Sequence, residues 1–192
     1  MFFITRRIIK FFIIVGILAG LSYSVFTSSP VQRLFYPILY PEYVFQYANL
    51  YKIDPYLVAA VIRGESRFSH TAESGSGARG LMQIMPDTAE WAAEQLEINF
   101  HPEMLFDPEY NIRIGCWYLR RLQNDFGGNL TIVLASYNAG QGNVRNWLDN
   151  GVWDGKLAHL EQIPFSETRF YVQKVLRYYD CYRLLYEKKD LP

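Results

Sequence analysis

A glutamate near the end of a predicted helix is the side chain of this sequence best placed for acid–base chemistry. Leu57, Val61 and Glu65 follow one another at intervals of four residues, so the carboxylate continues an apolar stripe. Burial along that stripe and the negative end of the helix dipole would both raise the pKa of Glu65. An acid that keeps its proton near neutral pH can serve as a general acid. A glutamate that faces water at a helix end is the alternative.

Neutral hydrogen-bonding groups accompany this acid along the chain. A glycine-rich loop follows Glu65 within ten residues and leads into Gln83, whose amide can both donate and accept hydrogen bonds. Glycines allow the backbone of such a loop to approach a ligand closely. Tyr137 and Asn138 supply another aromatic ring and another amide at a predicted helix end. A turn, a cap or core packing explains each residue separately, but together they favour a neutral polyhydroxylated ligand, meaning a glycan.

The glycine-rich loop also contains a pattern known from nucleotide-binding proteins. Gly75, Gly77 and Gly80 spell G-x-G-x-x-G, which binds dinucleotides where a strand precedes it within a βαβ unit. Here a predicted helix precedes the glycines, so we reject nucleotide binding. The 19 Lys and Arg balance the 19 Asp and Glu, which argues against nucleic acid as a partner. The three histidines lack metal-ligand spacing, so no metal or other cofactor is expected.

The pattern of apolar residues beyond the first 41 positions is helical. Helix-start signals, each a capping residue or a proline, occur at Asp54-Pro55, Pro86, Asp107-Pro108 and Asn129. A last helix is predicted from about Ser166 to Glu187. The loops after Phe68 and Trp153 leave room for short strands, but no alternating β-branched run of useful length occurs. The sequence therefore predicts one mainly α domain.

The N-terminal residues differ from this domain in composition. Three Lys or Arg residues precede an apolar run from Phe11 to Phe26, and counting from Ile8 makes the run long enough for a membrane span. The basic tip places the N-terminus in the cytoplasm and the domain outside. A cleaved signal peptide is the alternative, although S-Y-S at 22–24 is a poor cleavage site. We expect a cytoplasmic tip and single-pass transmembrane helix over 1–26, a linker without helical period over 27–41 and an extracytoplasmic domain over 42–192.

Four short motifs occur in a fixed order. They are Glu65-Ser66, Gly80-Leu81-Met82-Gln83, Ser136-Tyr137-Asn138 and E-T-R-F-Y-V from Glu167 to Val172. In order and content they resemble the catalytic domain of the soluble lytic transglycosylases, a branch of the lysozyme-like superfamily, and the match runs from about Ile53 to Leu176. The family usually has alanine where this chain has Ser136, which is expected to add a tolerated hydroxyl beside the site. The resemblance implies a lysozyme-like fold.

The resemblance also implies a reaction, the cleavage of the β-1,4 bond between MurNAc and GlcNAc in peptidoglycan without water. Glu65 would protonate the leaving oxygen while the N-acetyl group of MurNAc stabilises C1. Glu65 would then act as a base toward the C6 hydroxyl of the same sugar, which closes a 1,6-anhydro ring. No other acid stands near Glu65 in the chain to act as a nucleophile, whereas ordinary glycosidases use two carboxylates. Glu73 and Asp87 are conceivable candidates, but we interpret them as loop and helix-start residues.

The resemblance assigns further residues to the site. Glu167 would help to line the sugar groove, although a first-turn glutamate paired with Arg169 is an equal alternative. Tyr171, one turn further on, would hydrogen-bond near Glu65 and hold it in place. Ser66 is interpreted as a supporting residue and not as a nucleophile, because its motif offers no histidine to activate it. The other predicted substrate-binding residues are Gly80, Leu81, Met82, Gln83, Tyr137 and Asn138.

Two other functions remain open at this point. A lysozyme-type hydrolase on the same fold would add water in place of closing the ring. A non-catalytic glycan-binding protein of the cell envelope would use the same groove without chemistry. The intact glutamate at position 65 argues against the second of these.

Overall fold

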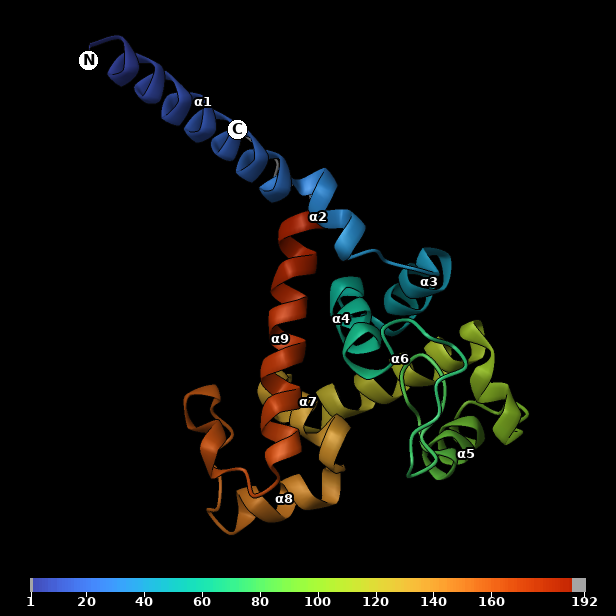
Figure 1. Cartoon of the computed structure of the whole chain (residues 1–192). Coiled ribbons are helices and arrows are strands. Elements are labelled where there is room, and N and C mark those ends of the chain that lie inside the picture. The colour runs from blue at the N-terminus through green and yellow to red at the C-terminus, as the bar shows by residue number, and fades with distance from the viewer. Residues whose placement is uncertain (1, 188–192) are drawn as a thin grey trace. The chain divides into compact units, whose positions relative to one another are not determined.

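The computed structural model describes the backbone of residues 2–187 and the side chains of residues 11–187. Helices make up most of the chain (Figure 1). Within the described residues no strand forms, and only isolated bridges join Arg79 to Glu73 and to Ile84. The prediction of a mainly α chain is therefore confirmed. The chain divides into two compact units, one of residues 1–37 with the chain from 185 onward, the other of residues 38–184.

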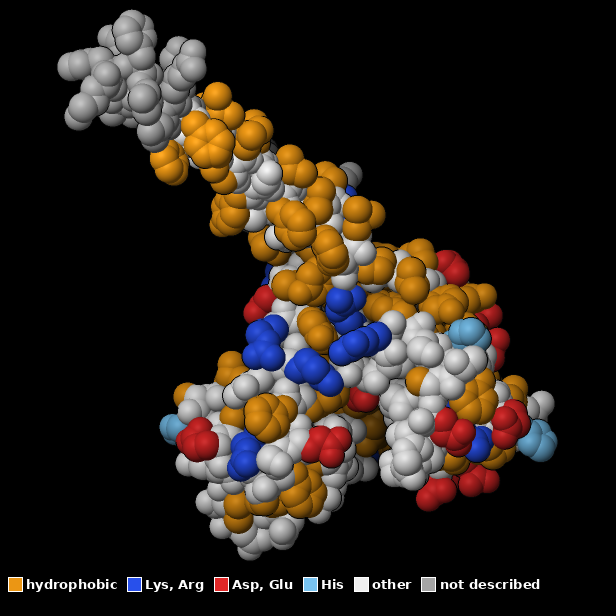
Figure 2. All heavy atoms as spheres, in the orientation of Figure 1, with side chains coloured by type: hydrophobic (Ala, Val, Ile, Leu, Met, Phe, Trp, Pro, Cys, Tyr) orange, Lys and Arg blue, Asp and Glu red, His pale blue; other side chains and the backbone are white. Residues whose placement is uncertain are grey.

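The smaller unit begins with α1 (Phe2–Thr27), followed by the short α2 (Ser29–Phe35). Hydrophobic side chains cover the face of α1 seen in Figure 2, and those of the Phe11–Phe26 run are largely exposed. Among the residues with described side chains, no single helix is both long and apolar enough to cross a membrane. The bent pair Phe11–Thr27 and Ser29–Phe35 meets those limits jointly, with a 60° angle at the break. The segment predicted to cross the membrane is therefore helical, but that it crosses a membrane stays a prediction.

The linker predicted to lack helical period contains α2. Ser28 is extended and Pro30 occupies the first turn of α2, where its fixed φ and missing N–H favour helix initiation. Arg33 on this helix donates from Nε to the Leu185 carbonyl oxygen at 2.9 Å. Its guanidinium also lies over the Tyr186 ring, 4.9 Å from the centroid. Within the smaller unit, α2 is thus fixed to the end of the last helix.

The larger unit consists of helices and irregular loops. Its helices are α3 (Pro41–Tyr51), α4 (Pro55–Glu65), α5 (Pro86–Gln95), α6 (Pro108–Asp125), α7 (Leu130–Ala139), α8 (Gln141–Asp149), α9 (Ser166–Tyr186), which ends in the smaller unit, and the 3₁₀ helices η1 (Pro102–Phe106) and η2 (Leu157–Gln162). The predicted caps at Asp54, Asp107 and Asn129 are confirmed, because each side chain accepts a hydrogen bond from a backbone N–H of its own helix. Helices α3 and α8 were not predicted.

Helix α4 forms the centre of the core. Six consecutive residues of α4, from Leu57 to Ile62, are buried, as expected for a helix that is apolar on all sides. Its neighbour α9 approaches closely at Gly64, where a Cβ atom would lie 2.8 Å from Cγ2 of Val175. This packing brings the C-terminal end of α4, and Glu65 with it, against the first turns of α9.

The loop between α4 and α5 is held by its own backbone hydrogen bonds and by a buried side chain of α6. Asn111 on α6 accepts a hydrogen bond from the Met82 N–H at 2.7 Å and donates to the carbonyl oxygens of Arg79 at 2.9 Å and Leu105 at 2.8 Å. Gly80 has a φ of +75°, and a Cβ atom there would collide with the Leu105 carbonyl and the Asn111 side chain. The loop therefore has one fixed path, which ends at Gln83.

Candidate active site

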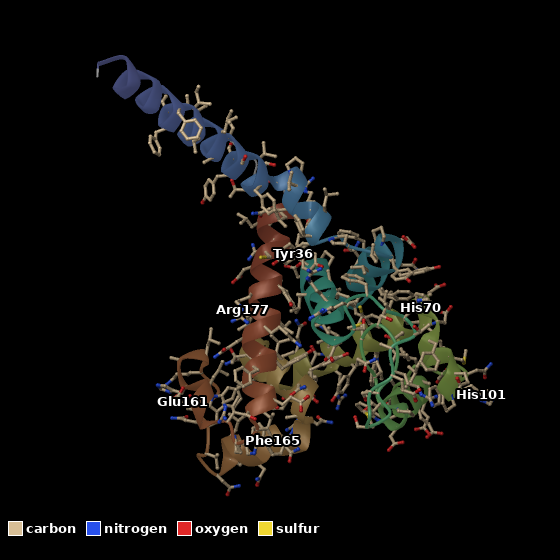
Figure 3. All side chains as sticks on the ribbon, viewed as in Figure 1. Tyr36, His70, His101, Glu161, Phe165 and Arg177 are labelled. Atoms are coloured by element: carbon tan, nitrogen blue, oxygen red, sulfur yellow. The ribbon has the colours of Figure 1, made fainter. Side chains whose placement is uncertain are left out.

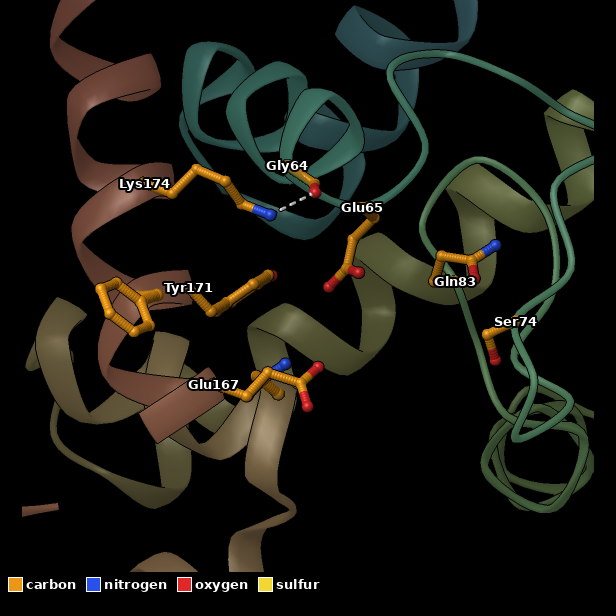
Figure 4. Close-up of a pocket in the computed structure, with 9 residues that line it drawn as sticks. Gly64, Glu65, Ser74, Gln83, Glu167, Tyr171 and Lys174 are labelled. Atoms are coloured by element: carbon orange, nitrogen blue, oxygen red, sulfur yellow. Dashed lines mark hydrogen bonds between the residues drawn. The ribbon is translucent and has the colours of Figure 1, made fainter. Parts of the chain in front are cut away.

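A cavity of about 420 Å³ lies where the end of α4, the glycine-rich loop and the start of α9 meet. It is lined by Gly64, Glu65, Ser74, Gln83, Asn138, Glu167, Phe170, Tyr171 and Lys174 (Figure 4). Two adjoining cavities of about 260 and 200 Å³ share Gln83 and Asn138 with it and add Tyr137 to the lining. Because the three spaces share lining residues, they adjoin one another and together form a groove larger than any one of them.

The Glu65 carboxylate points into this cavity (Figure 4). The residue is half-buried, so the cavity reaches its carboxylate although protein atoms surround most of it. Desolvation by burial raises the pKa of Glu65 to about 7, and the Glu167 carboxylate adds to the rise. The Tyr171 hydroxyl and the Lys174 ammonium oppose it. The predicted elevation of this pKa is confirmed, with burial as its main cause.

Two tyrosines stand beside this acid, the buried Tyr171 and the half-buried Tyr137. Tyr137 donates from its hydroxyl to the Met82 carbonyl oxygen at 2.8 Å. Tyr171 extends toward Glu65 (Figure 4). Its hydroxyl forms no hydrogen bond with any of the described residues. Burial and the Glu65 charge raise the pKa of both phenols well above the ordinary value, so both remain protonated. Tyr171 is therefore a neutral donor ready for Glu65 or for a ligand.

The amides in the groove present complementary groups. Gln83 donates from Nε2 to the carbonyl oxygens of Gly80 at 2.9 Å and Ala72 at 3.1 Å, which leaves its Oε1 as the acceptor. Thr168 donates from its hydroxyl to Oδ1 of Asn138 at 2.7 Å, which leaves the Asn138 NH₂ group as the donor. One amide can thus accept from a ligand while the other donates to it.

Glu167 brings another carboxylate into the cavity. Its side chain lines the same space as Glu65 (Figure 4). The alternative of a pair with Arg169 finds no support, because Arg169 donates to the backbone carbonyl oxygens of Ile163 at 2.8 Å and Glu161 at 3.2 Å. Of the acids considered from the sequence, Glu73 forms an ion pair with Arg79 at 3.0 Å, and Asp87 lies in the first turn of α5.

Four predicted substrate-binding residues lie behind the cavity wall. Leu81 and Met82 are completely buried, and Gly80 faces η1 and Asn111. Ser66 donates from its hydroxyl to the Leu81 carbonyl oxygen at 2.7 Å, which agrees with its interpretation as a supporting residue. None of the four is among the residues that line the three cavities, and these contacts fix the loop that carries Gln83.

Ser136 does not lie where the sequence suggested. The residue is completely buried, and its hydroxyl has no hydrogen-bond partner among the described residues. The cavity linings contain its neighbours Tyr137 and Asn138 instead. The expected hydroxyl beside the site is therefore a hydroxyl in the core.

The cavity also contains residues that the sequence analysis missed. Ser74 comes from the loop, while Phe170, which is 71% exposed, and Lys174 come from α9. Glu167, Phe170, Tyr171 and Lys174 are spaced by three and four residues, which places them on one face of a helix. That spacing was a usable signal for Phe170 and Lys174, whereas Ser74 lies in an irregular loop and gave none.

Comparisons with known proteins extend this description. The family model of the transglycosylase SLT domain matches residues 42–159, and that of the soluble lytic transglycosylase helical domain matches residues 162–190. The soluble lytic murein transglycosylase of Escherichia coli (strain K12) is 41% identical over 153 residues, which cover 77% of this chain and 23% of that protein. The membrane-bound lytic murein transglycosylase C of Serratia proteamaculans is 32% identical over 155 residues, covering 69% of this chain and 43% of that protein.

Solved structures show the same similarity. The crystal structure of the 70 kDa soluble lytic transglycosylase from Escherichia coli superposes with a TM-score of 0.77 at 39% identity, covering 83% of this chain and 26% of that one. The fold of this chain thus agrees with the expected lysozyme-like class. The chain spans only about a quarter of the length of these Escherichia coli proteins.

Proposed function

Because this chain belongs to the transglycosylase SLT domain family, we propose that it is a lytic transglycosylase that cleaves peptidoglycan glycan strands. One observation carries the proposal: Glu65 lines the groove and has a pKa of about 7. A group with this pKa is protonated in a large share of molecules at neutral pH, and it loses and regains its proton at little cost. No metal or other cofactor enters the reaction.

In the proposed reaction Glu65 transfers a proton in both directions. It first donates its proton to the oxygen that links MurNAc to GlcNAc, and the bond between that oxygen and C1 breaks. The N-acetyl group of MurNAc stabilises the electron-poor C1. The C6 hydroxyl of the same sugar then attacks C1 and passes its proton to Glu65, which yields the 1,6-anhydro end and restores the acid without water.

The remaining groove residues position the sugar in this proposal. The Gln83 Oε1 accepts from a sugar hydroxyl or an acetamido N–H, and the Asn138 NH₂ group donates to a sugar oxygen. Tyr171 donates to the Glu65 carboxylate once Glu65 has lost its proton. Ser66, Gly80, Leu81 and Met82 support the groove from behind. Tyr137 contributes to the wall through its bond to Met82.

A hydrolase with the same groove is the main competing function. The observation that favours it is Glu167, because most glycosidases use two carboxylates in one site. Mass spectrometry of digested glycan strands separates the two reactions, because an anhydro end is one water lighter than a reducing end. We expect anhydro ends, and a digest dominated by reducing ends would contradict the proposal.

Substitution of the proposed acid tests whether the groove is catalytic at all. We expect Glu65→Gln to lower the rate of strand cleavage by about a hundredfold or more, because the amide cannot donate the proton. Glu90→Gln is the matched control, since Glu90 is an exposed acid on α5, and it should leave the rate unchanged. A Glu65→Gln variant that cleaves at nearly the wild-type rate would exclude the mechanism. A wild-type chain that binds strands and releases no product would indicate a non-catalytic binding protein.

We also propose that α1 anchors the chain in the cell membrane, with the catalytic unit on the extracytoplasmic face. The basic tip and the exposed apolar side chains of α1 support this placement. Relatives named as soluble and as membrane-bound lytic murein transglycosylases are both similar to this chain.

A further inference from the structure

Lys174 connects the two helices that meet at the cavity. It lies on α9, three residues beyond Tyr171, and its Nζ donates to the Gly64 carbonyl oxygen at 2.8 Å (Figure 4). Gly64 directly precedes Glu65 at the end of α4. The carbonyl groups of the last helical turn have no partner within their helix, and a cation near them is favourable. Lys174 therefore stabilises the turn that carries the Glu65 side chain.

The ammonium group of Lys174 has a defined position. Its stem passes Gly64 closely, since a Cβ atom at Gly64 would lie 3.6 Å from Cε of Lys174. Its Nζ lies 5.6 Å from the centroid of the Tyr171 ring, within the range of a cation–π contact. A carbonyl oxygen and an aromatic face together restrict the ammonium to the cavity side of α9.

The charges around Glu65 explain why this position matters. Glu167, Tyr171 and Lys174 face Glu65 from α9, and Tyr137 faces it from α7. Glu167 disfavours a negative charge on Glu65, and the two phenols stay neutral. Among these facing groups Lys174 alone is positively charged. When Glu65 gives up its proton, Lys174 is the group that balances the new negative charge.

We propose that Lys174 is a positioning residue for Glu65, which holds the end of α4 through the Gly64 carbonyl and favours the ionised carboxylate between the two proton transfers. The inference rests on the proposed function of Glu65. Lys174 exchanges no proton and touches no reacting atom in this role. Its effect is to keep the protonated and ionised forms of Glu65 close in free energy, which a group that donates and then accepts a proton requires.

The test compares three variants of the full chain. Lys174→Met removes the charge and the donor but keeps most of the stem, and Lys174→Arg restores both. Arg177→Met is the matched control, because Arg177 (labelled in Figure 3) is an exposed cation one turn further along α9 and outside the cavity lining. The measurement is the pH dependence of kcat/KM, together with the titration of the Glu65 carboxyl carbon followed by ¹³C NMR, which needs no turnover.

We expect Lys174→Met to move the alkaline limb of kcat/KM and the Glu65 titration upward by about half a pH unit or more, because a favourable charge is lost. Lys174→Arg should return both toward the wild-type pH, and Arg177→Met should leave both unmoved. A Lys174→Met variant that lowers the rate without moving either midpoint would overturn the inference, as would an equal shift in Arg177→Met. These outcomes are distinct from failure of the proposed function, which would appear as an active Glu65→Gln variant.

Discussion

The Glu65 carboxyl is subject to opposing influences, of which burial is the largest, and its protonated and ionised forms are therefore similarly populated at neutral pH. Burial and Glu167 favour the protonated form, while Tyr171 and Lys174 favour the ionised form. Burial has the largest effect of the four, so the pKa of Glu65 is about 7 and lies above that of an ordinary glutamate. A carboxyl group held at this balance can give a proton to a leaving oxygen and accept one back within the same turnover.

The pH dependence of cleavage follows from this balance. In the proposed reaction only protonated Glu65 can start cleavage, and the population of this form falls as pH rises through a pKa of about 7. We expect kcat/KM on soluble glycan strands to decline above about pH 7, approaching tenfold per pH unit. An acid with an ordinary pKa would lose activity from about pH 4.5 upward. A flat profile between about pH 5 and 9 would show that Glu65 is not the proton donor.

Local sequence was enough to predict the behaviour of Glu65 but not the composition of its cavity. The stripe through Leu57 and Val61 lies on the same helix as the acid, so its burial could be inferred from spacing alone. Ser74 reaches the cavity through the course of an irregular loop, and Lys174 reaches it through the packing of α9 on α4. No short spacing encodes the course of the loop, so Ser74 could not be predicted. The spacing of Lys174 from Glu167 and Tyr171 indicated a shared helix face, but not that this face packs against the end of α4.

At the scale of elements, the groove depends on a loop without regular structure. The segment from Ser66 to Met85 is held by backbone hydrogen bonds of its own, such as the pair between Arg79 and Ile84, and by Asn111. The three hydrogen bonds of Asn111 join this loop and η1 to α6. Asn111 therefore connects the loop to α6. Gln83, at the end of the loop, is placed in the groove as a result.

Asn111→Ala should destabilise the protein by about 3 kcal/mol or more, because it leaves the Met82 N–H and the Leu105 carbonyl without a partner in the core. The Arg79 carbonyl keeps only its bond from the Ile84 N–H. Asn124→Ala is the matched control on the same helix, and its exposed side chain should contribute less than about 0.5 kcal/mol. Denaturant unfolding of both variants provides the measurement. Equal stabilities for the two variants would mean that the loop is held by other contacts.

The element boundaries were predictable where the chain carries a capping side chain. Asp54 and Asp107 each precede a proline and each cap the helix that follows. Helix α3 instead follows Tyr40, which has a φ of +55°, and α8 follows Gly140; neither has a side-chain cap. Pro41 in the first turn of α3 was a local signal, but it lies at the end of the segment interpreted as a linker. Helix α8 has neither a side-chain cap nor a proline in its first turn, so the sequence alone did not reveal it.

At the scale of the whole molecule, the proposed anchor decides where the enzyme works. We expect the full chain to sediment with membranes and to retain its N-terminal residues. Leu18→Lys, in the middle of the apolar run, should move a substantial share of the chain to the soluble fraction, because a central lysine costs about 3 kcal/mol of insertion free energy. Leu184→Lys places the same change at an exposed site on α9 and should leave the distribution unchanged.

Fractionation followed by N-terminal sequencing checks this expectation. A wild-type chain recovered mainly in the soluble fraction and shortened near residue 26 would identify a cleaved signal peptide instead. Such a result would leave the proposed reaction untouched, because the residues of the groove belong to the larger unit.

The burial of Glu65 also sets a tension between catalysis and folding. Below about pH 4.5 the Glu65 carboxyl is protonated in the folded and unfolded chain alike, so its ionisation does not change the free energy of unfolding. Between that pH and the folded-state pKa of about 7 the unfolded chain releases the proton first, and the free energy of unfolding falls. Above neutrality the loss amounts to as much as about 3 kcal/mol. The inactive Glu65→Gln variant should therefore melt at a higher temperature than the wild type in mildly alkaline buffer and lose that advantage in acid. The side chain that carries the proposed reaction thus weakens the fold at the pH values at which it is needed.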